Sequence, residues 1–168
     1  MYNLSGQDVE YKNVDSLYHV IDSLYTNNAD VEDIHKLVNL ILKSDTLNAN
    51  LFYFKGWYYD NKSEYEVAKH FYFRAITVDT LHFEALCNLG ILFYNEGIKE
   101  FEIATQRTYR QYLELHIIAS NKFRLSKIFF ERAFSVNPYE PELIKILEEI
   151  KRRELNNKKF IDRNEKDL

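Results

Sequence analysis

The side chains able to do chemistry are few in this sequence, and they are scattered along it. The histidines and the single cysteine are His19, His35, His70, His82, Cys87 and His116. No two histidines have the HExxH spacing of a zinc protease, and no second cysteine is present to complete a structural zinc site. Paired acids such as Glu64 and Glu66 are typical of solvated helix faces. We therefore predict no catalytic residue, no metal site and no cofactor.

Cys87 is the one formal candidate for a nucleophile, with a distant histidine as its base. It falls inside a predicted helix of a repeat, where a small and inert packing residue is the favoured interpretation. The phosphate-binding patterns GxxxxGK[ST] and GxGxxG do not occur in the sequence. We expect the protein not to be an enzyme.

Charge and hydropathy disfavour two further classes. Of the 168 residues, 22 are Lys or Arg and 26 are Asp or Glu, a net charge of −4. Residues 1–82 carry 7 bases and 12 acids (−5), and residues 83–168 carry 15 and 14 (+1), so neither half has the basic surplus of a nucleic-acid binder. No apolar window is long enough for a membrane span. A lone cysteine and a start unlike a signal peptide predict a cytoplasmic protein; the alternative is a periplasmic or lipid-anchored one whose signal has been removed.

The elements that position these side chains are predicted to be helices. Only 4 Gly and 2 Pro occur beside 46% hydrophobic residues, which disfavours a β-sandwich with its many turns. An offset of 34 residues aligns two segments, in which Phe52, Gly56 and Tyr59 fall on Leu86, Gly90 and Phe93. Each copy has a large apolar residue, then glycine, then an aromatic residue, which indicates an internal repeat.

A second half follows the first copy. Ala68, Tyr72 and Ala75 lie four and three residues apart, the spacing of one helix face. The whole pattern resembles the tetratricopeptide repeat, W-x2-L-G-x2-Y followed by A-x3-F, A and P. Lys55 and Thr80 depart from its Leu and its Pro. The resemblance implies antiparallel helix pairs that stack into an α-solenoid. We expect Asn61-Lys62-Ser63 to form the turn within this repeat, with Ser63 as the N-cap of its second helix.

Further copies are less regular. Residues 15–48 form a weaker repeat, with Asp22 in the place of the glycine and Ile34 in the place of the alanine, as is common at the end of a stack. Near the other end, a clear second-helix half reads Ser126, Phe130, Ala133 and Pro138. Residues 141–156 carry an apolar stripe at helical spacing and are predicted to be a capping helix.

Residues 83–140 break the period in a way that leaves two interpretations open. One is a single repeat with about 24 extra residues; the other treats 107–140 as a further repeat and leaves 83–106 about ten residues short. Under both, residues 98–119 are expected to be helical. The overall prediction is an all-α fold, a short α-solenoid of about three to four repeats over 15–156. A tail is expected at each end, residues 1–14 and the charged 157–168.

In such a stack the first helix of each repeat lines a concave surface. The resemblance therefore implies a groove for a partner, lined by Asn50, Tyr53, Trp57, Asp60, Asn61, Glu84, Cys87, Ile91, Tyr94 and Asn95. Trp57 is the only tryptophan, packing does not require it there, and exposed tryptophan is favoured as a binding anchor. Of the residues that family members use to clamp a carboxylate, Asn88 is the only compatible one here, so an apolar or aromatic ligand segment is favoured.

The predicted function is non-catalytic: binding a peptide or helical segment of a partner protein, with no nucleic acid and no membrane span. Two alternatives remain at this point. The segment 98–119 could fold back over the aromatic residues of the groove. The chain could also be a structural subunit that forms a homodimer or scaffolds a larger, envelope-associated assembly.

Overall fold

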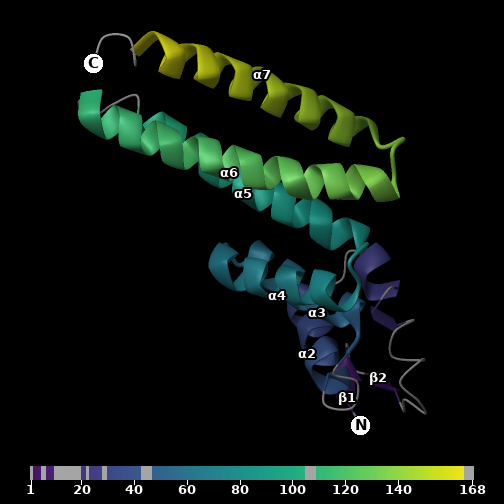
Figure 1. Cartoon of the computed structure of the whole chain (residues 1–168). Helices are drawn as coiled ribbons and strands as arrows, with labels where there is room; N and C mark the ends of the chain where they lie inside the picture. The colour runs from purple at the N-terminus through teal and green to yellow at the C-terminus, as the bar shows by residue number, and fades with distance from the viewer. Residues whose placement is uncertain are drawn as a thin grey trace. The chain divides into compact units, whose positions relative to one another are not determined.

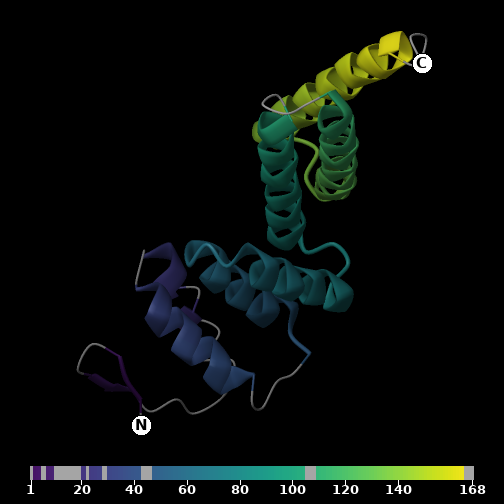
Figure 2. The same cartoon turned by 90° about the vertical axis from the view of Figure 1, so that its left-hand side faces the viewer.

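A computed structural model shows helices preceded by a small β-hairpin (Figures 1 and 2). The chain separates into two compact units, residues 1–80 (unit 1) and residues 81–168 (unit 2). The structure describes residues 2–4, 7–9, 20–21, 23–27, 30–42, 47–104 and 109–164.

Unit 1 begins with strands β1 (Tyr2–Leu4) and β2 (Gln7–Val9), which pair antiparallel with Tyr2 opposite Val9. This hairpin lies within the segment predicted to be a tail, and the sequence analysis did not predict it. Strands of three residues are too short to show the apolar–polar alternation by which strands are recognised. All other regular elements among the described residues are helices, as predicted.

Helical turns at 20–21 and 23–26 are followed by α2 (Val31–Ile41). The Asp30 carboxylate caps α2 by accepting the backbone N–H of Glu32 at 2.8 Å. Ile34, Val38 and Ile41 recur at helical spacing on one face of α2, and each is 0% exposed. The weaker repeat therefore supplies a buried helix face even though its small residues are replaced.

Helices α3 (Ala49–Asn61) and α4 (Tyr65–Val78) form the next pair. They approach closely at Gly56, where an added Cβ would lie only 2.5 Å from the ring of Tyr72. Tyr72 is fully buried, as are Ala68 and Ala75 on the same face of α4. The residues of the repeat pattern therefore hold this pair together by steric fit.

The turn between α3 and α4 corrects one prediction. Ser63 is not the N-cap of α4, which begins at Tyr65 after Glu64. Ser63 instead has φ = 61°, and it ends α3. Its N–H donates to Asp60 O at 2.9 Å, and the next N–H donates to Tyr59 O at 2.9 Å. These two hydrogen bonds around a residue in the left-handed conformation form a Schellman motif, so Ser63 terminates α3.

Unit 2 consists of α5 (Phe83–Ala104), α6 (Tyr109–Val136) and α7 (Pro141–Asn164). Helices α5 and α6 are 22 and 28 residues long, whereas α3 and α4 have 13 and 14. The residues that break the 34-residue period therefore lie within two long paired helices, and α5 continues through Gly97. The described part of 98–119 is helical, as predicted.

Two glycine–phenylalanine contacts hold α5 against α6. A Cβ on Gly90 would lie 2.8 Å from the Phe130 ring, and a Cβ on Gly97 would lie 2.9 Å from the Phe123 ring. The residue numbers of each pair add to 220, as an antiparallel register requires. Between them, the buried hydroxyl of Ser126 donates to Gly90 O at 2.8 Å. The seam is therefore closed by small residues on α5 and aromatic residues on α6.

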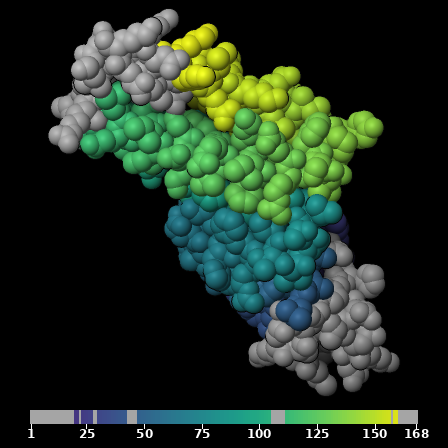
Figure 3. All heavy atoms as spheres, viewed as in Figure 1, coloured from purple at the N-terminus to yellow at the C-terminus, as the bar shows by residue number. Residues whose placement is uncertain are grey.

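Helix α7 packs along α6 (Figure 3) and buries Leu143, Leu147 and Ile150. It starts at Pro141, where a proline has no intrahelical donor to lose. It continues to Asn164, so the charged tail predicted from residue 157 is partly helix. The segment lacks an apolar stripe, but three of its eight residues from 157 to 164 are Lys or Arg, and it has no Gly or Pro. An established helix can extend through such residues.

Candidate functional site

The structure places the first five predicted groove residues on α3, in unit 1. Asn50 and Asn61 are exposed, Trp57 and Asp60 are half-buried, and Tyr53 is buried, with 7% of its surface exposed. Of the aromatic residues predicted on this helix face, Trp57 thus offers more open surface than Tyr53.

Trp57 belongs to a group of rings that we call the α3 aromatic cluster: Tyr25, Tyr53, Phe54 and Trp57. Tyr25 is its hub, with ring centroids 5.2 Å from Trp57 and 5.5 Å from Phe54 in edge-to-face geometry. The hydroxyl oxygens of Tyr25 and Tyr53 lie 3.3 Å apart. Tyr25 itself is 37% exposed, so the cluster reaches the surface at Tyr25 and Trp57.

Sequence analysis did not assign Tyr25 to the candidate site. Tyr25 aligns with Tyr59, which lies 34 residues later, and the repeat pattern assigns this position to packing between helices. The signal that could have found it is the weakness of the first repeat. Where a repeat lacks its small residues, its helices cannot pack closely enough to bury all their aromatic rings, and one ring stays partly exposed.

The two polar residues at the end of α3 make hydrogen bonds within the α3–α4 pair. Asp60 accepts a hydrogen bond from the hydroxyl of Tyr72 at 3.2 Å, and burial raises the pKa of the Asp60 carboxyl. The amide of Asn61 donates to the backbone oxygen of Trp57 at 2.8 Å. Asp60 therefore fixes the ring that fills the space at Gly56, and Asn61 helps to close the last turn of α3.

The other five predicted groove residues lie on α5, in unit 2. Glu84, Ile91 and Asn95 are exposed, with Ile91 at 43%, while Cys87 and Tyr94 are half-buried. Burial raises the pKa of the Cys87 thiol to about 12. The thiol is therefore protonated at neutral pH, which removes the property that a cysteine nucleophile needs.

Tyr94 is covered by side chains of its own unit. Its ring centroid lies 5.6 Å from that of Phe123 on α6, and the Arg153 guanidinium of α7 lies 5.8 Å from the Tyr94 centroid. Glu149 holds Arg153 at 2.7 Å. Hydrogen bonds from Tyr94 and then from Arg153 lower the pKa of the Glu149 carboxyl. These contacts with Tyr94 come from residues outside 98–119, the segment expected to be able to cover the groove.

A pocket of about 270 Å³ lies in unit 2, beside Phe123 and Arg153. Its walls come from α5, α6 and α7. His116 lines it and is 7% exposed, with ring centroids 5.3 Å from those of both Phe101 and Tyr112. Burial lowers the pKa of His116, which favours the neutral imidazole. Sequence analysis did not predict this pocket, because its residues come from three helices and show no common spacing.

Within the described residues, no group of three or more His, Cys, Asp or Glu side chains is arranged to hold a metal ion. None of the described helices is both long and apolar enough to cross a bilayer.

Comparison with solved structures identifies the fold. One match is the type III secretion translocator chaperone SycD of Yersinia enterocolitica, with a TM-score of 0.56 and 15% identity over 86% of this chain and 87% of that chain. A second is SycD in complex with a peptide of the translocator YopD, with a TM-score of 0.50 and 14% identity over 90% and 97%. This chain shares the helical fold of SycD. No protein-family model matches the sequence, and no curated protein sequence matches it.

The shared fold agrees with the tetratricopeptide-like helix pairs predicted from the 34-residue offset. At this level of identity the likeness to SycD establishes the fold alone. In this chain, α3 bears the half-exposed Trp57 next to Tyr25, and α5 bears the exposed Ile91.

Proposed function

We propose that this chain binds an extended or helical segment of a partner protein and catalyses no reaction. The observation that carries the proposal is the α3 aromatic cluster, in which Trp57 is half-exposed and held in place by Tyr25 at 5.2 Å. A large ring that is positioned by its neighbours and still reaches solvent is the usual anchor of a protein interface. SycD, which has the same fold, has been solved with a peptide of YopD.

The proposed binding residues lie on one helix face in each unit. On α3 they comprise Trp57 with its predicted neighbours Asn50, Tyr53, Asp60 and Asn61. On α5 they comprise the exposed Ile91 with Glu84, Cys87, Tyr94 and Asn95. On each face the apolar and aromatic side chains outnumber the charged ones, which suits a ligand segment with apolar or aromatic side chains.

The chemistry of the candidate residues supports a role without catalysis. Cys87 carries a protonated thiol, and His116 is surrounded by rings, with a lowered pKa. We also propose a cytoplasmic location, which suits a chain with one cysteine.

The test uses Trp57 both as anchor and as reporter, because it is the only tryptophan. Peptides selected from a random library on the full chain are titrated against it while the tryptophan emission is followed. We expect selected peptides to be rich in apolar and aromatic residues and to shift that emission. Competition with a labelled peptide then gives the affinity of variants that lack the tryptophan. Trp57→Ala should weaken binding roughly tenfold or more, as for an anchor residue.

The matched control is Tyr139→Ala, which removes another large ring, 89% exposed and in unit 2. It should leave the affinity unchanged. Equal affinity of the wild type and Trp57→Ala, with both folded by circular dichroism, would show that the α3 face is not the binding surface.

A further inference from the structure

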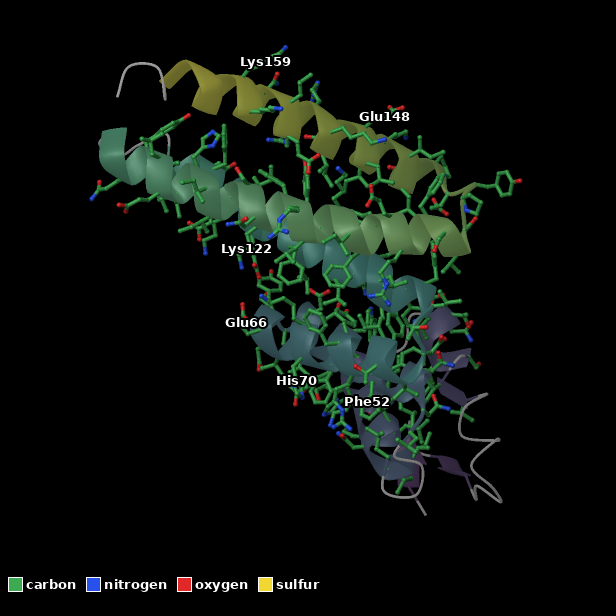
Figure 4. The ribbon with its side chains drawn as sticks, viewed as in Figure 1. Phe52, Glu66, His70, Lys122, Glu148 and Lys159 are labelled. Atoms are coloured by element: carbon green, nitrogen blue, oxygen red, sulfur yellow. The ribbon has the colours of Figure 1, made fainter. Side chains whose placement is uncertain are left out.

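Two cationic side chains and an imidazole lie on unit 1, over the contact between α3 and α4, away from the residues predicted for the groove. We call this group the α3–α4 basic patch: Lys55, His70 and Arg74 with the rings of Phe52 and Phe71 (Figure 4 labels Phe52 and His70). Lys55 is the residue that departs from the Leu of the repeat pattern, and the functions considered so far do not account for it.

Both cations of the patch rest on aromatic rings. The Lys55 ammonium lies 4.7 Å from the centroid of Phe71, and the Arg74 guanidinium lies 4.2 Å from the centroid of Phe52. His70 stands edge-on to Phe71 at 5.3 Å, one helical turn before Arg74. A cation held over a ring is restrained before any ligand arrives, and a guanidinium in this position keeps N–H groups at its edge.

The two cations lack an acidic partner among the described residues. No carboxylate there lies within ion-pair distance of Lys55 or Arg74. The acidic residues of α3 and α4 are engaged elsewhere: Glu66 pairs with Lys69 at 2.7 Å, and Asp60 accepts a hydrogen bond from Tyr72 at 3.2 Å. Burial and then the charge of Arg74 lower the pKa of Lys55, which shows that the two cations repel one another.

The chemistry of the complementary ligand follows from size and charge. Residues 1–82 have a net charge of −5, so a long polyanion such as nucleic acid meets repulsion around the patch. A flexible chain with one or two carboxylates can reach Lys55 and Arg74, and it meets less of this repulsion than a long polyanion does. The half-buried ring of Phe71 can contact the methylene groups of a glutamate or aspartate side chain, whereas Phe52, 3% exposed, serves only to hold Arg74.

From this arrangement we infer that the α3–α4 basic patch binds an acidic stretch of the partner polypeptide, its side-chain carboxylates pairing with Lys55 and Arg74. The inference rests on the proposed function, because it assumes that the ligand is a polypeptide. It adds a second point of attachment, on a different surface from the α3 aromatic cluster and with different chemistry.

The experiment is a titration of the full, isotope-labelled chain with hexaglutamate capped at both ends, followed by backbone amide shifts. We expect shifts concentrated around residues 52–56 and 70–74, and weaker binding as salt is added. Capped hexaglutamine is the neutral control and should cause none. Similar shifts with hexaglutamine, or shifts spread evenly over the chain, would overturn the inference.

Variants separate the patch from general charge. Lys55→Gln/Arg74→Gln should weaken hexaglutamate binding roughly three- to tenfold, the effect of losing two partly exposed charge pairs. Lys36→Gln/Lys145→Gln removes the same charge from exposed lysines that already pair with Asp33 and Glu142, and it should bind as the wild type does. Lys55→Arg/Arg74→Lys keeps both charges and should retain binding, which excludes a folding defect as the cause.

Three further outcomes are informative. If inorganic phosphate or a short oligonucleotide shifts the same amides and hexaglutamate does not, the patch is a phosphate site and the inference is wrong. If library-selected peptides bind through Trp57 but Lys55→Gln/Arg74→Gln leaves hexaglutamate binding unchanged, the inference fails and the proposed function stands. If no selected peptide depends on Trp57 while hexaglutamate binds as expected, the proposed function fails by itself.

Discussion

The ring of Tyr72 occupies the space that a side chain on Gly56 would need. An added Cβ would lie 2.5 Å from two of its ring carbons, and Tyr72 is 0% exposed. The hydroxyl of Tyr72 is tied to Asp60 at 3.2 Å, so the ring is held at both ends. The close contact between α3 and α4 therefore depends on Gly56 having no side chain at the place where the Tyr72 ring lies.

Gly56→Ala is expected to destabilise the protein by about 2 kcal/mol, because overpacking outweighs the helix preference of alanine. The free energy of unfolding in urea measures this. Tyr72→Leu makes room, so the double variant Gly56→Ala/Tyr72→Leu should lose less stability than the two single losses added together. Additive losses would contradict the steric explanation.

Ser63→Gly is expected to stabilise the protein by about 1 kcal/mol, since glycine adopts the left-handed φ of 61° without steric cost. Ser63→Val should destabilise it, because a β-branched residue is disfavoured there. The control is Ser135→Gly, at an exposed serine in the last turn of α6, where glycine should lower stability, although less than in the middle of a helix. Thermal unfolding of the three variants gives the comparison, and the same sign at both sites would refute the role of the turn.

Asp60→Asn is expected to change how stability depends on pH. Burial raises the pKa of Asp60 in the folded state, so the folded protein binds a proton more tightly than the unfolded chain does. Stability should therefore fall as pH rises from the ordinary carboxyl pKa through the raised one. Asp60→Asn keeps an acceptor for Tyr72 and should remove that part of the fall.

The measurement for Asp60 is the midpoint of thermal unfolding across the acidic range. Glu64→Gln serves as the control, because it removes an exposed carboxyl next to the same turn. An identical change in the pH profile for both variants would mean that net charge, and not burial, is responsible.

Cys87 is expected to react slowly with iodoacetamide in mildly alkaline buffer, since its thiol has a pKa of about 12 and is half-buried. Alkylation followed by mass spectrometry should be at least about tenfold faster in urea, where the thiol returns to its ordinary pKa. A folded protein that reacts as fast as the unfolded one would reopen the nucleophile interpretation.

The packing of the helices could be predicted from the sequence where a single residue type satisfies the geometry. Gly56 and Gly90 are spaced by the repeat, and each faces a ring from the following helix, Tyr72 and Phe130. A close approach demands glycine, and glycine is rare in this chain, so the pattern is readable. The same logic applies to Ala68, where a larger side chain would not fit the buried face.

Other features could not be predicted, for reasons that are also physical. Gly97 aligns at the 34-residue offset with Ser63, where α3 ends, yet α5 continues through Gly97 and makes a second close contact there, with Phe123. Ser63 has a side chain suited to capping, but its backbone is used to end α3, and φ cannot be inferred from composition. The α3–α4 basic patch joins Lys55 to Arg74, which are brought together only by the antiparallel pairing of two helices.

The neighbours of the candidate groove residues could not be predicted from the sequence either. The ten predicted residues are distributed between α3 and α5. Sequence spacing placed them on these helices, but it did not show which side chains would cover them. Tyr25 beside Trp57 and Arg153 over Tyr94 both come from other helices of the same unit. Such neighbours depend on tertiary packing, for which no local pattern exists.

The contacts of Gly90 with Phe130 and of Gly97 with Phe123 are separated by seven residues on each helix (97 − 90 and 130 − 123). Seven residues are close to two helical turns, whereas one added residue rotates everything beyond it by about 100°. The length of this helical hairpin is therefore adjustable in discrete steps. Seven residues added to both arms would extend the hairpin by about 10 Å and keep the register of the two glycine–phenylalanine contacts. A descendant or a designed version could thus carry a longer arm on an unchanged core.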